Sequence, residues 1–215
     1  MKKNLLIILT LAAAIAGWAL LAYMFHNYDL KEKYYGKAYS RQAPDFNLID
    51  QDGLPISLKR FRGKVVLIEW GYTNCPDVCP VTLSKLKKVM EELGNRSADV
   101  QVLFITVDPE RDTPERLKKY IPYFNKDFIG VTGTPEGIKK TARDYGVTIV
   151  KHEKVYGRSE KDHWDKYLMT HTNTVFLVDG DGTLLLTYPH YLLEPANIAS
   201  DIKKLLREKE KIPTM

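Results

Sequence analysis

Residues 64–80 read KVVLIEWGYTNCPDVCP, and this stretch decides the fold. Val65 to Trp70 is a nearly continuous apolar run, which is typical of a buried central strand. A loop with the pattern Cys-Pro-Asp-Val-Cys follows, and from Cys79 to Leu93 apolar residues recur at helical spacing. The stretch therefore predicts a buried strand, a cysteine-bearing loop and a helix in direct succession.

The flanking sequence extends this pattern in both directions. Thr113-Pro114 and Thr134-Pro135 each predict a helix start, because threonine caps a helix well and proline is tolerated at its first position. Further expected elements are a hairpin over 46–58, strands at 102–107 and 128–131, a hairpin over 174–187 and a helix over 195–208. This order predicts an α/β, thioredoxin-like fold with a mixed central sheet. Strands at 147–150 and 154–156 would form an inserted hairpin within residues 147–170.

The N-terminal segment has the character of a targeting element. Lys2 and Lys3 precede an uncharged stretch from Leu5 to Phe25, which matches the roughly 20 apolar residues that cross a bilayer. We therefore expect one N-terminal transmembrane helix, with an anchor at 1–28, a linker at 29–42 and the thioredoxin-like domain at 43–210. A cleaved signal peptide is the alternative.

The net charge of +5 is concentrated before the domain. Residues 1–41 hold six basic and two acidic side chains, so only about one net positive charge remains for the rest. A nucleic-acid-binding protein would carry its basic stripe on the folded domain. The distribution therefore excludes nucleic acid as a partner and favours a membrane surface. With a signal-like anchor, the domain is expected on the extracytoplasmic side.

The chain has two cysteines, and both lie in the loop, at Cys75 and Cys79. Their position at a helix start favours the thiolate, which is both a nucleophile and a metal ligand. The extra residue in Cys-x-x-x-Cys loosens the fit for routine dithiol exchange but allows both sulfurs to chelate one ion. The alternative is a permanent disulfide with a purely structural role, although closing so short a loop would add little stability. Asp77, between the cysteines, is interpreted as a solvated acid rather than a ligand.

Two thiolates suit Cu(I), whereas Cu(II) or Zn²⁺ would need a further ligand, usually imidazole. His171 directly precedes the strand expected at 174–178. In a thioredoxin fold the loop before that strand lies beside the cysteine loop, so His171 is placed to reach the sulfurs. The other histidines have no such placement and are expected to be ordinary residues: His26, His152, His163 and His190.

Three blocks together resemble the Sco/SenC family, over about residues 43–207. They are GKVVL with GYTNCPDVCP at 63–67 and 71–80, VDPERDT at 107–113, and YLMTHT with FLVD at 167–172 and 176–179. The resemblance implies copper, as Cu(I) or Cu(II), bound by Cys75, Cys79 and His171. One position departs from the family pattern, because Thr170 stands where an acidic residue often precedes the histidine.

The resemblance also implies a function and its partners. It implies a metallochaperone that assists assembly of the dinuclear copper site of cytochrome c oxidase, by delivering copper or by reducing that site's cysteines. The partners would be the copper-bearing subunit of the oxidase and another thioredoxin-like reductase or copper carrier. The alternative is a thiol–disulfide oxidoreductase without metal delivery, with Cys75 and Cys79 as its redox-active pair. A peroxiredoxin relative ranks last, since a peroxidatic site needs no metal triad.

Overall fold

The computed structural model describes residues 2–152 and 167–210. Its main sheet has eight strands in the described residues, in the order β1-β10-β9-β4-β5-β6-β2-β3. The strands are β1 Lys37–Gln42, β2 Leu48–Asp50, β3 Pro55–Ile56, β4 Val65–Gly71, β5 Val100–Thr106, β6 Ile129–Thr132, β7 Ile149–His152, β8 Leu168–His171, β9 Thr174–Val178 and β10 Thr183–Pro189. The α-helices are α1 Lys2–Lys33, α2 Val78–Leu93, α3 Pro114–Tyr120, α4 Pro135–Tyr145 and α5 Pro195–Glu210.

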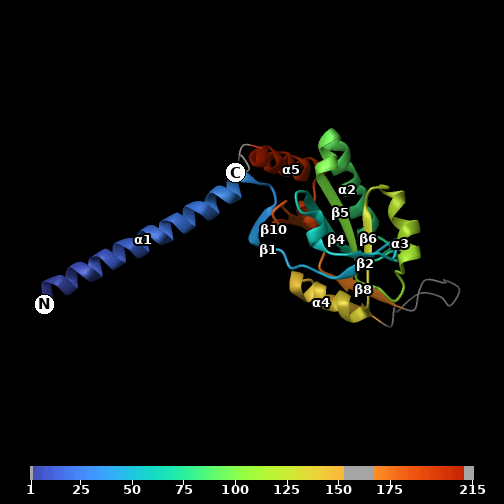
Figure 1. Cartoon of the computed structure of the whole chain (residues 1–215), viewed down its shortest axis with the longest axis horizontal. Helices are drawn as coiled ribbons and strands as arrows, with labels where there is room; N and C mark the ends of the chain where they lie inside the picture. The colour runs from blue at the N-terminus through green and yellow to red at the C-terminus, as the bar shows by residue number, and fades with distance from the viewer. Residues whose placement is uncertain (1, 153–166, 211–215) are drawn as a thin grey trace.

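The sheet is mixed, as the sequence predicts. β4, β5 and β6 run parallel, whereas β9 and β10 form an antiparallel hairpin and β9 pairs antiparallel with β4. Right-handed crossovers place α2 and α3 on one face, and the chain then crosses to the other face through α4. Figure 1 shows α4 across the sheet from α2 and α5.

The central strand β4 is buried at all seven positions. Trp70 faces α4, where its ring lies 6.0 Å from that of Tyr145. Because side chains alternate along a strand, Glu69 and Gly71 face the opposite side, toward α2. Burial on both faces explains why the strand is an apolar run rather than an alternating one.

The helix starts that the sequence predicts are confirmed. The side chain of Thr113 accepts a hydrogen bond from the backbone N–H of Arg116, and that of Thr134 accepts one from Gly137. Helix α4 ends at Gly146, whose φ of 72° lies in the left-handed region that favours glycine.

Two details differ from the sequence prediction. Residues 37–42, expected within a linker, form β1 and pair antiparallel with β10 at the edge of the main sheet. β7 pairs with β8, a strand that the sequence does not predict, and the strand expected at 154–156 lies outside the described residues. The inserted hairpin thus joins two segments that are distant along the chain.

The N-terminal helix α1 extends away from the rest of the chain (Figure 1). Within residues 2–152 and 167–210, no helix combines the length and apolar character needed to cross a membrane. The transmembrane helix expected at the N-terminus is therefore not confirmed.

Candidate metal centre

The cysteine loop leaves the end of β4 at Gly71, where space is tight. A Cβ at this position would lie 2.5 Å from the ring of Phe104 and 3.1 Å from the sulfur of Cys79. Only a residue without a side chain therefore lets the loop and α2 settle this close to the sheet. The carbonyl of Gly71 accepts a hydrogen bond from the backbone N–H of Val107 at 2.7 Å, which ties the loop to the end of β5.

Asp112 anchors the cysteine loop through hydrogen bonds to its carboxylate. Its carboxylate accepts hydrogen bonds from the backbone N–H of Thr73 at 3.0 Å, the hydroxyl of Thr73 at 2.5 Å and the hydroxyl of Thr106 at 2.6 Å. Asp112 is fully buried, so these bonds offset the cost of removing its carboxylate from water. The segment that follows β5 thus fixes the backbone that carries the cysteines.

The two cysteines lie in different environments. Cys75 is partly exposed, whereas Cys79 is 0% exposed. The backbone N–H of Cys79 points at the sulfur of Cys75 over 3.4 Å. The Cys79 thiol and the backbone N–H groups at the start of α2 lower the pKa of Cys75 to about 5. The same pairing, together with burial, raises the pKa of Cys79. The pair therefore consists of one thiolate and one thiol near neutral pH.

His171 comes to this pair from the end of β8, whereas the sequence predicts it in a loop. Its Nε2 lies 3.8 Å from the sulfur of Cys79, and its Nδ1 lies 3.0 Å from the carbonyl oxygen of Thr172. A proton on Nδ1 would satisfy that carbonyl and leave the Nε2 lone pair facing the sulfur. Burial lowers the pKa of His171, so its imidazole is neutral at neutral pH.

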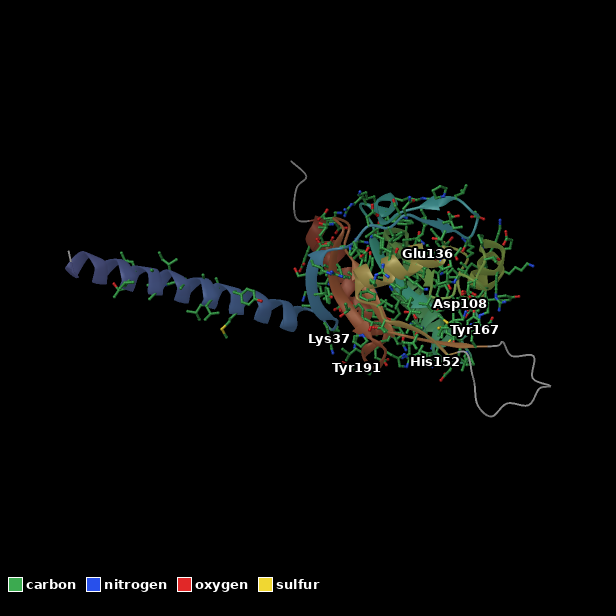
Figure 2. All side chains as sticks on the ribbon, turned by 90° about the horizontal axis from the view of Figure 1, so that it is seen from below. Lys37, Asp108, Glu136, His152, Tyr167 and Tyr191 are labelled. Carbon is green, nitrogen blue, oxygen red and sulfur yellow. The ribbon has the colours of Figure 1, made fainter. Side chains whose placement is uncertain are left out.

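The hairpin that carries His171 is held by Arg111. The guanidinium of Arg111 pairs with Asp108, donates to the carbonyl oxygen of Tyr167 at 3.1 Å and lies 3.7 Å from the centre of the Tyr167 ring. The hydroxyl of Tyr167 in turn donates to Asp108 at 2.7 Å. Figure 2 shows Asp108 and Tyr167 together at the base of β8. The salt-bridged segment at 108–112 therefore positions the strand of His171.

The remaining candidates are either exposed or outside the described residues. His152 is exposed and its Nε2 lies 3.0 Å from the hydroxyl of Thr170, on the outer face of the hairpin. His190 is exposed, and His163 lies outside the described residues, as does the side chain of His26. Asp77 is exposed and its side chain caps no backbone N–H.

The described residues contain no group of three His, Cys, Asp or Glu side chains already placed to hold a metal ion. The structure thus brings His171 and Cys79 together and leaves the ligand set of Cys75, Cys79 and His171 as a prediction.

Sequence reasoning missed two features of this centre. The sequence does not predict the stacking of Arg111 on Tyr167. Glu69 was counted as part of an apolar strand, although it is a fully buried carboxyl on the face of β4 toward α2. A single acid within an apolar run is the signal that could have identified it.

The chain is similar in sequence and fold to known proteins. The family model SCO1/SenC matches residues 36–207. A SCO2-like protein of Rickettsia conorii is 36% identical over 151 residues, which cover 70% of this chain and 69% of that protein.

Solved structures are similar over most of their length. The copper-bound ScoI of Arabidopsis thaliana has a TM-score of 0.68 and 32% identity, covering 78% of this chain and 99% of that one. BsSco, whose structure is described as showing a disulfide switch in a member of the Sco family of cytochrome c oxidase assembly proteins, has a TM-score of 0.59 and 25% identity. That match covers 79% of this chain and 96% of the BsSco chain. This chain belongs to the SCO1/SenC family.

Proposed function

We propose that this chain is a copper-binding metallochaperone that assists assembly of the dinuclear copper site of cytochrome c oxidase. Copper is its cargo, held by Cys75, Cys79 and His171. Membership of the SCO1/SenC family supports the proposal, as do the copper-bound ScoI structure and the assembly role stated for BsSco.

The distance of 3.8 Å between the Cys79 sulfur and the His171 Nε2 carries the proposal. A sulfur and a nitrogen that share one ion, at about 2.3 and 2.0 Å from it, stand roughly 3.5–4 Å apart. Cys75 is on the open side of the pair and can turn its thiolate toward the same point. Two soft thiolates and one imidazole form a donor set that suits copper in both oxidation states.

The second candidate function is thiol–disulfide exchange without metal delivery. It is favoured by the thiolate character of Cys75, whose pKa is lowered to about 5, next to a second thiol. A thiolate at neutral pH is the attacking group that such exchange requires. Reduction of the cysteines of the oxidase copper site would use the same pair, so the two functions share one reduced state.

Copper titration of the metal-free chain tests the proposal. His171→Ala is expected to weaken Cu(II) binding far more than Cu(I) binding, because two thiolates still hold Cu(I) at low coordination. Replacing either cysteine by serine should weaken binding of both ions. His152→Ala and His190→Ala are matched controls and should change neither. Wild-type Cu(II) affinity in His171→Ala would show that the ligand assignment is wrong.

We also propose that residues 1–28 anchor the domain on the extracytoplasmic side of a membrane. The uncharged run from Leu5 to Phe25 is the only support for this. The mass of the intact protein extracted from membranes tests it, and loss of the first 28 or so residues would contradict it.

A further inference from the structure

A groove lies between α4 and the hairpin of β7 and β8 that carries His171. Its volume is about 580 Å³, within the range of roughly 300–1,000 Å³ that ligand-binding pockets occupy. Three parts of the chain line it, namely α4, residues 107–110 after β5, and the hairpin. Figure 1 shows α4 and β8 next to each other. The residues proposed to hold copper do not line the groove, so it is a separate feature of the molecule.

The floor of the groove is apolar. Ile138 and Ala142 are four residues apart on α4 and therefore share one face of the helix, where each is 1% exposed. On the hairpin, Ile149 and Met169 also line the groove, but they are only partly buried. They leave apolar surface that a ligand can cover, and covering it removes that surface from water.

The same face of the hairpin carries His171. In the register of the two strands, Ile149 pairs with His171. Two residues further along, Lys151 pairs with Met169. Residues directly opposite each other in an antiparallel pair share a face, as do residues two apart on one strand. A molecule that fills the groove therefore contacts the face of the hairpin that presents the imidazole.

The charges at the rim are unequal. Both acids of the lining already have cationic partners, because Asp108 pairs with Arg111 and Glu110 pairs with Lys151 at 2.7 Å. Two further cations line the groove on α4, at Lys139 and Arg143. Both are exposed, and neither forms an ion pair within residues 2–152 and 167–210. Four residues apart on the helix, they lie next to each other and favour an anionic ligand.

We propose that this groove binds an acidic segment of a protein partner, with an apolar side chain on the floor and flanking carboxylates at Lys139 and Arg143. A protein is favoured over a free carboxylate because a partner that exchanges copper or electrons at the cysteines must come close to the His171 hairpin. This choice of partner rests on the proposed function. Complementary charge gives such a partner its specificity and its rate of association.

The test presents the metal-free full chain to an array of extended peptides. Each peptide carries one leucine, methionine or phenylalanine, flanked on both sides by aspartate or glutamate at every spacing of one to three positions. A control peptide of the same shape has asparagine or glutamine in place of the acids. The best acidic peptides should bind about tenfold or more tightly than their controls, because only they form the two charge contacts. Added salt should weaken this binding, since both cations are exposed.

Charge reversal on α4 tests the two cations. The double variant Lys139→Glu, Arg143→Glu should bind the acidic peptides about tenfold or more weakly than the wild type does. Lys140→Glu is the matched control, because Lys140 lies on the same helix outside the groove and pairs with Asp144. It should bind the peptides as the wild type does. Lys139→Gln, Arg143→Gln serves as a second variant should the double reversal fail to fold, and it should also weaken binding.

Methionine methyl groups report where the peptide binds. Met169 lines the groove, whereas Met90 is buried on α2, across the sheet from α4 (Figure 1). In NMR spectra of the chain labelled with carbon-13 at its methionine methyl groups, an acidic peptide should shift the Met169 signal and leave the Met90 signal in place. A shift of Met90 without one of Met169 would place the peptide elsewhere and overturn the proposal.

Three further results would overturn it: no binding of any acidic peptide by the wild type, equal binding of acidic and control peptides, or equal binding by the wild type and the double reversal. Octanoate or glutarate bound as tightly as the best peptide, with the same dependence on Lys139 and Arg143, would make the groove a site for a small carboxylate instead. Copper titration separates this proposal from the proposed function, because the double reversal should keep wild-type copper affinity. Absence of copper binding in every chain would overturn the proposed function and leave the acidic-peptide site standing.

Discussion

Cys75 and Cys79 differ more than their shared motif suggests. One sulfur is partly exposed and receives the backbone N–H of the other residue at 3.4 Å, whereas the second sulfur is enclosed beneath the loop. The start of α2 and the neighbouring thiol both favour negative charge on Cys75. We therefore expect Cys75 to be the nucleophile of the pair and the first ligand to contact an incoming ion.

This asymmetry predicts selective alkylation. At pH 7 iodoacetamide should modify Cys75 at least about tenfold faster than Cys79, because the thiolate is the reactive form. Cys79→Ala removes the hydrogen bond that most lowers the pKa of Cys75, so the rate for Cys75 should begin to fall at a higher pH than in the wild type. Mass spectrometry of quenched samples measures both rates, and equal modification of the two cysteines would refute the assignment.

Glu69 makes the stability of the folded protein depend on pH. Its pKa is raised in the folded state, so the folded protein holds a proton that the unfolded chain has lost above its usual pKa of about 4.3. The folded state is consequently stabilised relative to the unfolded one at low pH, and this contribution is lost as the pH rises toward the raised pKa.

Glu69→Leu should therefore raise the free energy of unfolding more at pH 8 than at pH 5. Because it removes a buried carboxyl that has no hydrogen-bond partner among the described residues, the gain at pH 8 should be about 1–3 kcal/mol. Urea unfolding of the reduced, metal-free chain at both pH values measures the difference, with Glu92→Gln as the exposed control. A gain that is the same at both pH values would mean that Glu69 does not titrate differently in the two states.

At the scale of elements, the hairpin of β7 and β8 decides where His171 lies. Ile149 pairs with His171 in its register, and Tyr72 of the cysteine loop approaches the imidazole edge-on with ring centres 6.4 Å apart. The Arg111 side chain connects this hairpin to the loop after β5 through the Tyr167 carbonyl and ring. Orientation of the imidazole thus depends on contacts outside the proposed ligand set itself.

Arg111→Met should weaken Cu(II) binding by about tenfold, which is the lower end of the effect of removing a residue that supports a metal ligand. Methionine keeps much of the length of the side chain but loses the ion pair with Asp108 and the bond to Tyr167. The alkylation rate of Cys75 should not change, since the cysteine loop is held by Asp112. An unchanged Cu(II) affinity would show that the hairpin keeps its position without Arg111.

Elements whose boundaries depend on neighbouring residues are predicted well from the sequence. Pairings between segments that are distant along the chain are not. The caps at Thr113, Thr134 and Gly146 depend on a few neighbouring residues, so the corresponding helix boundaries are confirmed. β1 was missed because all six of its residues are exposed and show no alternation. Its position depends on pairing with β10, almost 150 residues later.

In the candidate site, too, features that follow from the order of elements are predictable from the sequence, and features that depend on tertiary packing are not. The placement of both cysteines at a helix start and of His171 beside them follows from the order of elements. The pairing of β7 with β8 spans residues 153–167, so local pattern could not set it. Likewise, the burial of Glu69 and the stacking of Arg111 on Tyr167 appear only once the strands and loops are packed together.

At the scale of the whole molecule, the segment that leads into β1 is bound to the C-terminal helix. The backbone N–H groups of Tyr35 and Gly36 donate to the buried carboxylate of Asp201 on α5, at 3.0 and 2.9 Å. The buried ring of Tyr34 places its hydroxyl 3.0 Å from Glu208. We therefore expect the stable domain to start near residue 34, with β1 covering an edge of the sheet that would otherwise be open.

A chain that begins at Tyr34 should consequently be more stable than one that begins at Ala43. Removing residues 34–42 takes two hydrogen bonds from a buried carboxylate, and each bond to a charged group contributes roughly 1.5–3 kcal/mol. We expect the shorter chain to lose about 3 kcal/mol or more in the free energy of unfolding, measured in urea, and to associate through the exposed edge of β10. Asp201→Asn in the longer chain separates the two effects, because it weakens the same hydrogen bonds while β1 still covers the edge. If the chains beginning at Tyr34 and Ala43 unfold at the same urea concentration and both stay monomeric, then β1 is a dispensable extension and the boundary at residue 43 is correct.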